Sequence, residues 1–361
     1  MSKIVSIGTA VPAYCHQQMD ILPFMQTVYC TQEAEKRKLR YIYQHSGIQQ
    51  RYSVLADYGR SVGEWKFYPQ TENLEPFPTL EQRMAVFNKQ APLLSVDAIR
   101  NCLNGVLHDR DITHLITVSC TGMSAPGLDL QVLELMDVPK NIVRTSVNFM
   151  GCYAAIHALK LADAFCNSDA RAKVLIVCTE LCTLHFQREN TLDNITSSLL
   201  FGDGAAAVLV TADDGVLKGL HINHFYAEVI PKGKRDMAWE LSSSGFLMML
   251  SGYVPDLLEE DFAPVVERCL QKSNWSAADV TSWCIHPGGK RILEAVQHCM
   301  GLEAAQLQAS YHTLQQHGNM SSATILFVLK ELMHSKSSKN ILGAAFGPGL
   351  TIETFTATAC S

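Results

Sequence analysis

The sequence predicts an α/β fold made of two duplicated halves. Short, nearly continuous apolar runs, such as those at 173–179 and 340–346, are typical of strands buried on both faces of a sheet. They alternate with longer segments whose apolar residues recur with the period of a helix. A strand, a helix and two more strands follow one another up to residue 210, and a similar order recurs between residues 285 and 356. A chain of 361 residues can bury the core that two such units need.

The first half is expected to begin with a buried strand at 3–10 that ends before Pro12. Residues 17–45 are helical in pattern, and 55–79 form a loop rich in glycine and proline. The remaining elements are a helix at 80–106, strands at 112–119, 142–147 and 173–179, a turn and helix from 124 to 135, and a turn and strand at 198–210.

The second half is expected to start after Asp214, so that the chain divides into 1–214 and 215–361. A strand at 217–224 precedes a loop at 226–244. The other expected elements are helices at 262–272, 290–300 and 320–333, and strands at 282–286, 340–346 and 350–356.

The composition limits the classes of function. Hydrophobic residues make up 47% of the chain and charged residues 18%, as in soluble globular proteins. A net charge of −6 argues against a nucleic-acid partner or a polybasic membrane surface. The twelve cysteines are scattered through apolar runs, which indicates reduced thiols and a cytoplasmic protein. No apolar run is long enough to cross a bilayer, and the first residues lack the pattern of a signal peptide.

Cys152 stands at the turn into a segment with helical periodicity that runs to Ala164, with Ala155 and Leu159 among the apolar residues of one face. Gly151 before it permits a sharp turn and leaves the sulfur accessible. The free N–H groups and the positive end of the helix dipole favour a thiolate at this place. The alternative is an inert buried cysteine at a helix start.

Two further motifs place titratable or polar groups at the end of an apolar strand or the start of a helix. His286 precedes Pro-Gly-Gly, and Asn319 lies in the run His-Gly-Asn-Met-Ser-Ser. A nucleophilic cysteine needs a base or an imidazolium, and donors for the oxygen that gains charge. Taken singly, His286 reads as a turn residue and Asn319 as a helix N-cap. Their combination with Cys152 predicts a nucleophile, an imidazole partner and a neutral amide donor.

These motifs, with the segments GCYAAIHALKLAD, ELCTLHF, LLFGDGAAAVLV and GAAFGPGLTIETF, resemble the type III polyketide synthases, the chalcone and stilbene synthase family. The resemblance spans nearly the whole chain in order. It implies a thiolase-like αβαβα fold, a homodimer, and a catalytic set of Cys152, His286 and Asn319. A cysteine in the ELC segment and Trp239 are more typical of bacterial members.

The resemblance also implies the reaction. Cys152 accepts an acyl-CoA starter, and malonyl-CoA then loses carbon dioxide to give an enolate held by His286 and Asn319. Repeated extension and closure give a pyrone, resorcinol or phloroglucinol-type product. CoA thioesters are substrates, and no metal or redox cofactor is implied.

Further residues are expected from the resemblance to line the substrate cavity. They are Cys120, Thr121, Cys182, His185, Phe201, Trp239, Met248, Ser321, Gly347, Pro348 and Gly349. Phe201 matches a phenylalanine at the junction of CoA tunnel and cavity, and Phe246 is an alternative to Met248. Plant members carry threonines in place of Cys120, Cys182 and His185, and a glycine in place of Trp239. Sulfur-rich surfaces suit aliphatic or small acyl groups.

For CoA the expected contacts are Lys38, Arg51, Gly288 and Gly289, while Tyr41 and His45 replace basic residues of the plant pattern.

Three alternatives remain open. Cys178, Cys182 and His185 have a spacing that could serve a metal. A single-step ketoacyl synthase acting on acyl carrier protein would use a similar triad. A catalytically silent dimer is the alternative outside enzymes.

Overall fold

The computed structural model describes the chain except for residues 72, 214, 216, 235, 336–337 and 360–361. The strands before the expected boundary are β1 (Ser2–Ala10), β2 (Tyr14–Gln17), β3 (Gln50–Ser53), β4 (His114–Ser119), β5 (Val143–Asn148), β6 (Lys173–Leu181) and β7 (Asp203–Ala212). The strands after it are β8 (Leu220–Val229), β9 (Met237–Ser242), β10 (Gly245–Leu250), β11 (Ser282–Ile285), β12 (Asn340–Gly347) and β13 (Thr351–Ala359).

The helices follow the same division. Those of the first half are α1 (Gln18–Tyr29), α2 (Glu33–Gln44), α3 (Leu80–Leu103), α4 (Leu128–Glu134), α5 (Ala154–Ser168) and α6 (Leu192–Leu200). Those of the second half are α7 (Val254–Lys272), α8 (Lys290–Met300), α9 (Gln308–His317) and α10 (Thr324–His334).

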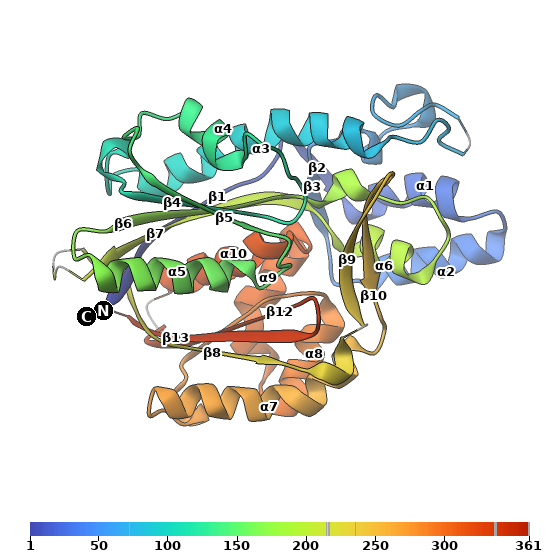
Figure 1. Ribbon diagram of the computed structural model, residues 1–361. Helices are drawn as coiled ribbons and strands as arrows, with labels where there is room; N and C mark the ends of the chain where they lie inside the picture. Colours follow the sequence, from blue (N-terminus) through green and yellow to red (C-terminus); the bar gives the residue numbers. More distant parts are fainter. Residues whose placement is uncertain (72, 214, 216, 235, 336–337, 360–361) are drawn as a thin grey trace.

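One hydrogen-bonded sheet runs through both halves in the order β11-β12-β13-β8-β1-β7-β6-β4-β5. Its two parts meet between β1 and β8, where pairing is confined to Lys3↔His221 and Ile4↔Leu220. Figure 1 shows the two parts stacked, with α3 and α4 above, α5 and α10 between, and α7 and α8 below. This arrangement confirms the predicted αβαβα layers. Asp214, at the predicted boundary, lies outside the described residues.

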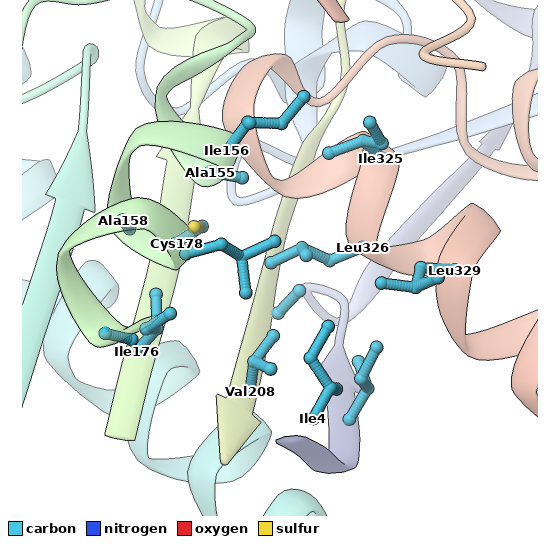
Figure 2. Packing of buried hydrophobic residues seen from close by; sticks show 14 of the residues in the cluster. Ile4, Ala155, Ile156, Ala158, Ile176, Cys178, Val208, Ile325, Leu326 and Leu329 are labelled. Atoms are coloured by element: carbon cyan, nitrogen blue, oxygen red, sulfur yellow. The ribbon is translucent and has the colours of Figure 1, made fainter. Parts of the chain in front are cut away.

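The middle layer carries the core that joins the halves. Ala155 and Ile156 of α5 and Ile325, Leu326 and Leu329 of α10 belong to one buried cluster (Figure 2). Small side chains on α5 allow this close packing. The start of α5, which follows Cys152, is therefore held rigidly between the two halves.

Two sequence predictions for the second half were wrong. Residues 226–244 are not a loop, because β8 continues to Val229 and the β9–β10 hairpin follows. Helix α7 starts at Val254 rather than at Phe262. Pro255 led to the prediction of a later start. Proline is nevertheless common in the first turn of a helix, because the backbone N–H that it lacks would have no partner within the helix there. None of the described helices has the length and apolar character of a membrane span.

Candidate active site

Three segments that are distant in sequence bring Cys152, His286 and Asn319 to one cavity. Cys152 lies between β5 and α5, His286 directly follows β11, and Asn319 lies between α9 and the 3-10 turn η8 (Ser321–Ala323). Their exposed fractions are 8%, 1% and 3%. All three line a cavity of about 450 Å³, which we call the outer cavity. The structure thus brings the three predicted residues together.

The turn before Cys152 has an unusual backbone. Phe149 and Gly151 adopt φ values of 58° and 81°, in the left-handed region. The N–H of Gly151 donates to the Cys120 sulfur at 3.0 Å, and the thiol of Cys152 points to the Ser321 hydroxyl at 3.7 Å. These contacts orient the sulfur toward the second half of the chain.

Burial shifts the pKa values of Cys152 and His286 in opposite directions. It raises the pKa of the Cys152 thiol to about 12, with the Ser321 hydroxyl partly opposing the shift, and lowers the pKa of His286 to about 3. The N-terminal end of α5, which was predicted to favour a thiolate at Cys152, is present. Burial opposes this effect, because it disfavours the charged form of the thiol. Among the described residues, neither ring nitrogen of His286 has a hydrogen-bond partner. Both nitrogens of this neutral imidazole are therefore available to a substrate or to the Cys152 thiol.

Asn319 is held in one orientation. Its carbonyl oxygen accepts from the N–H of Ser321 at 2.8 Å, and its amide donates to the Gly288 carbonyl at 3.4 Å. The Asn319 backbone pairs with the 200–202 segment, because its N–H donates to Leu200 and its carbonyl accepts from Gly202. The amide is thus fixed as a donor at the cavity wall.

A second, narrower cavity of about 70 Å³ adjoins the first, and we call it the inner cavity. It is lined by nine residues predicted for the substrate cavity, namely Cys120, Thr121, Cys182, His185, Phe201, Trp239, Met248, Ser321 and Pro348. Gly347 and Gly349 are not among the lining residues. They support the wall, since Gly347 abuts the Tyr153 ring and the N–H of Gly349 donates to the Met237 carbonyl at 3.1 Å.

Four residues line both cavities, namely Cys152, Phe201, Met237 and Met248. The Cys152 sulfur therefore lies where the two spaces meet. Met248 rather than Phe246 shares this junction with Phe201.

Met237 was not predicted, because its segment was expected to be a loop. The alternation of the apolar residues Met237, Trp239 and Leu241 with other residues is the pattern that could have indicated a strand.

The far wall of the inner cavity is an aromatic cluster. The His185 ring stacks on Phe246 at 4.2 Å, and Trp239 donates its indole N–H to the Cys120 carbonyl at 2.6 Å. His185 bonds the Thr121 carbonyl through Nε2 and accepts the Phe246 N–H at Nδ1. Because these bonds occupy both nitrogens and burial lowers its pKa to about 3, His185 is a neutral structural wall.

The possible metal set of Cys178, Cys182 and His185 does not form. The two nitrogens of His185 are engaged by the backbone. Within the described part of the chain, no three or more His, Cys, Asp or Glu side chains are grouped to hold a metal ion.

Glu180 is completely buried next to the inner cavity and was not among the predicted site residues. Its carboxylate accepts from the Cys120 N–H at 2.9 Å and the Thr121 hydroxyl at 2.8 Å, and also from the Ser322 hydroxyl. Burial raises its pKa, and these donors oppose the rise. Glu180 thereby ties the end of β4 to η8, next to Asn319. A charged residue at the end of an apolar strand was its sequence signal.

The predicted CoA contacts are only partly placed on the outer cavity. Gly288 and Gly289 line it, as do Tyr41 and His45, whose rings stack at 4.0 Å. Lys38 is exposed on α2, one turn before Tyr41, and does not line it. Lys290 and Arg291, at the start of α8, line it and were missed, although both follow the Gly288–Gly289 motif directly.

Arg51 requires a correction. Its side chain lies on the inner cavity instead of the outer one and is only 4% exposed. The guanidinium donates to the Gln18 side chain at 2.8 Å and to the Phe201 carbonyl. The alternation of strand β3 turns Arg51 inward, so the geometry does not support a contact with CoA phosphates.

Comparison with known proteins gives a consistent picture. Two family models, the N-terminal and C-terminal domains of chalcone and stilbene synthases, match residues 1–214 and 221–360. The chain is 28% identical over 365 residues to "Probable polyketide synthase 1" of Dictyostelium discoideum, covering 98% of this chain and 11% of that protein. It therefore spans about a tenth of that relative's length.

Solved structures are similar over the whole chain. PKS-I from the brown alga Ectocarpus siliculosus is 26% identical with a TM-score of 0.93, covering 99% of this chain and 98% of that one. The C-terminal type III polyketide synthase domain of Steely1, a type I/III hybrid from Dictyostelium, is 26% identical with a TM-score of 0.93, covering 100% and 99%. The chain belongs to the chalcone and stilbene synthase family, the type III polyketide synthases.

Proposed function

We propose that the protein loads an acyl-CoA starter on Cys152 and extends it by repeated decarboxylative condensation with malonyl-CoA. The observation that carries this proposal is the position of Cys152 between two cavities. A thioester can approach from the outer cavity while the acyl group enters the inner one. His286 and Asn319 stand on the outer side, where a malonyl thioester would arrive.

Loading is a thiol exchange. The Cys152 proton passes to a nitrogen of His286, the sulfur attacks the thioester carbonyl, and the bond from that carbon to the CoA sulfur breaks. His286 returns the proton to the departing CoA sulfur. The ring nitrogens of His286, which no described residue engages, support this base role. Burial opposes charge on either group alone, so the transfer relies on the mutual attraction of thiolate and imidazolium once both have formed.

Extension uses the amide of Asn319. Malonyl-CoA loses carbon dioxide, and the electrons of the broken bond form an enolate whose oxygen accepts hydrogen bonds from Asn319 and His286. The enolate carbon attacks the thioester on Cys152, releasing the sulfur and lengthening the chain. Fixed neutral donors favour such an oxyanion, and the rigid amide of Asn319 supplies one.

The rim of the outer cavity suits a nucleotide. The stacked rings of Tyr41 and His45 offer an aromatic face, and Lys290 and Arg291 offer positive charge for phosphates. The N-terminal end of α8 also opens on this cavity at Gly289, and helix N-termini favour anions. These features support a CoA-type substrate, and we include Lys38 as a phosphate contact one helical turn away.

We also propose a homodimer through β5. This strand ends the sheet order, and Val143, Arg144, Ser146 and Asn148 on it are exposed. Exposed Met123 and Leu135 lie on segments beside it. An unpaired edge strand with apolar neighbours is a template for pairing with a second copy. Light scattering of the wild type and of Val143→Lys tests this, since a dimer should weaken on charge insertion.

The decisive experiment measures release of CoA and carbon dioxide from malonyl-CoA with a panel of acyl-CoA starters. Products are identified by mass spectrometry, with Cys152→Ala as the control that should lose all chain growth. An inert enzyme across the panel would overturn the proposal. Turnover that requires malonyl-acyl carrier protein in place of malonyl-CoA would favour the single-step ketoacyl synthase instead.

A further inference from the structure

The side of the inner cavity formed by β3 and α6 carries polar side chains, in contrast to its aromatic far wall and to the apolar Ile21 and Met25 of α1. Arg51 of β3 and Ser197 of α6 both line it. Each carries a buried polar atom, Nη2 of Arg51 and Oγ of Ser197, that has no hydrogen-bond partner among the described residues. Buried polar groups are almost always paired, so two orphans on one cavity need an explanation.

The guanidinium of Arg51 is engaged on one side only. Its Nε donates to the Gln18 side chain at 2.8 Å, and its Nη1 donates to the carbonyl of Phe201. The Tyr43 hydroxyl lies close to the guanidinium, and the charge together with a weak side-chain interaction lowers the Tyr43 pKa against the effect of burial. It donates to the Ser198 carbonyl at 3.5 Å and lies outside hydrogen-bond geometry with Nη2. One nitrogen of the guanidinium, Nη2, is therefore left without a hydrogen-bond partner among the described residues, on a side chain that lines the cavity.

Among the described residues that line this cavity, none carries a carboxylate. Asp203 acts on the charge of Arg51 but does not line the cavity. Its oxygens accept from Thr183 and from the Val54 N–H at distances of 2.7 to 2.9 Å. His16 adds no charge, since burial lowers its pKa and its Nε2 bonds the Leu55 carbonyl.

We propose that Arg51 and Ser197 form a subsite for an acyl group that ends in a carboxylate. This inference rests on the proposed function, because it names the class of starter that Cys152 would accept. A guanidinium binds a carboxylate through directed, charge-assisted hydrogen bonds, and a hydroxyl can donate one more. A half-thioester of a dicarboxylic acid would place its thioester at Cys152 and its carboxylate at Arg51, within one cavity.

The subsite is linked to the catalytic residues. The Arg51 stem packs on Gly202 and Gly318, where an added Cβ would lie 3.5 Å and 2.8 Å from it. These glycines flank Phe201 and Asn319, so removing Arg51 can disturb catalysis in general. Any test must therefore separate recognition of the carboxylate from this structural role.

The experiment measures acylation of Cys152 by intact-protein mass spectrometry without malonyl-CoA. Succinyl-, glutaryl- and adipyl-CoA are each compared with the fatty acyl-CoA of equal chain length, and 5-oxohexanoyl-CoA is the neutral ketone. We expect the best dicarboxylic starter to load at least about tenfold faster than its fatty partner. Ser197→Ala and Arg51→Met should each lower that ratio, while Arg51→Lys should retain part of it.

Ser198→Ala is the matched control, because the Ser198 hydroxyl already donates to the Ile195 carbonyl at 2.8 Å. It should leave the ratio unchanged. Because each ratio is taken within one variant, a general loss of folding or reactivity cancels. Equal loading of all three starter types, or a ratio unaffected by Arg51→Met and Ser197→Ala, would overturn the subsite. If the subsite fails this test, loading of fatty acyl-CoA starters followed by malonyl-CoA-dependent extension of the acyl chain would still uphold the proposed function.

Discussion

Pro348 closes against Gly151, so that a Cβ built on Gly151 would lie 2.2 Å from Pro348 Cδ. Gly151 also has φ of 81°, which side-chain-bearing residues rarely adopt. Two segments almost two hundred residues apart thus fix the backbone immediately before the reactive sulfur. The loop after β12 shapes the cavity by this contact as well as by lining it.

The first prediction concerns this contact. Gly151→Ala should lower the free energy of unfolding by about 1–3 kcal/mol through backbone strain alone, with the clash adding to it. It should also slow acylation of Cys152, because the turn must shift. Gly105→Ala is the control, since Gly105 has φ of 72° but no atom within 4 Å of an added Cβ. Chemical denaturation and acylation rates check both; similar losses in both variants would contradict a role for Pro348.

Asn319→Ala should separate the two half-reactions. Loss of one oxyanion donor typically slows a reaction by about 10²–10³-fold, and decarboxylation of malonyl-CoA is the step that forms the oxyanion. Loading of a starter on Cys152 should fall much less. Stopped assays of carbon dioxide release and of acyl-enzyme formation measure each step. Equal loss in both would count against enolate stabilisation by this amide.

The stability of the protein should depend on pH through His185. Burial lowers its folded-state pKa to about 3 from an ordinary 6.5, so below pH 6.5 the unfolded chain binds a proton that the folded chain does not. Relative to His185→Phe, the wild type should therefore lose about 1.4 kcal/mol per pH unit as pH falls from 6.5 toward 3.

Urea unfolding at pH 8, 6 and 5 measures this difference, with replacement of the exposed His334 by Phe as the control. The His334→Phe variant should follow the wild type in parallel. A wild-type profile that also runs parallel to His185→Phe would show that His185 titrates normally.

Trp239 should limit the size of the product. Trp239→Gly removes the side chain that packs on His185 and Phe246, and so enlarges the inner cavity. We expect larger starters or longer products, with a loss of stability of roughly 1–3 kcal/mol because the indole is only partly buried. Trp275→Gly, which lies on neither cavity, should cost stability without changing the products seen by mass spectrometry.

The sequence alone predicted the layers, the family, and the three residues that the structure brings to one cavity. Cys152, His286 and Asn319 follow or precede regular elements, and the ends of strands and starts of helices converge in α/β folds. That convergence is a property of the topology, so the combination of local patterns, together with the family resemblance, predicted that the three residues would meet.

The tertiary structure decided which way side chains point and what lies opposite them. Arg51 was expected at the rim of the outer cavity but lies on the inner cavity. Successive side chains of β3 point to opposite sides of the strand, so a shift of one residue would reverse the side on which Arg51 lies. The tertiary structure also placed Met237 at the junction through the pairing of β9 with β10, and it set Pro348 on Gly151. Burial also governs the pKa values of Cys152 and His286, and burial is a sum over neighbours from both halves that no local stretch of sequence contains.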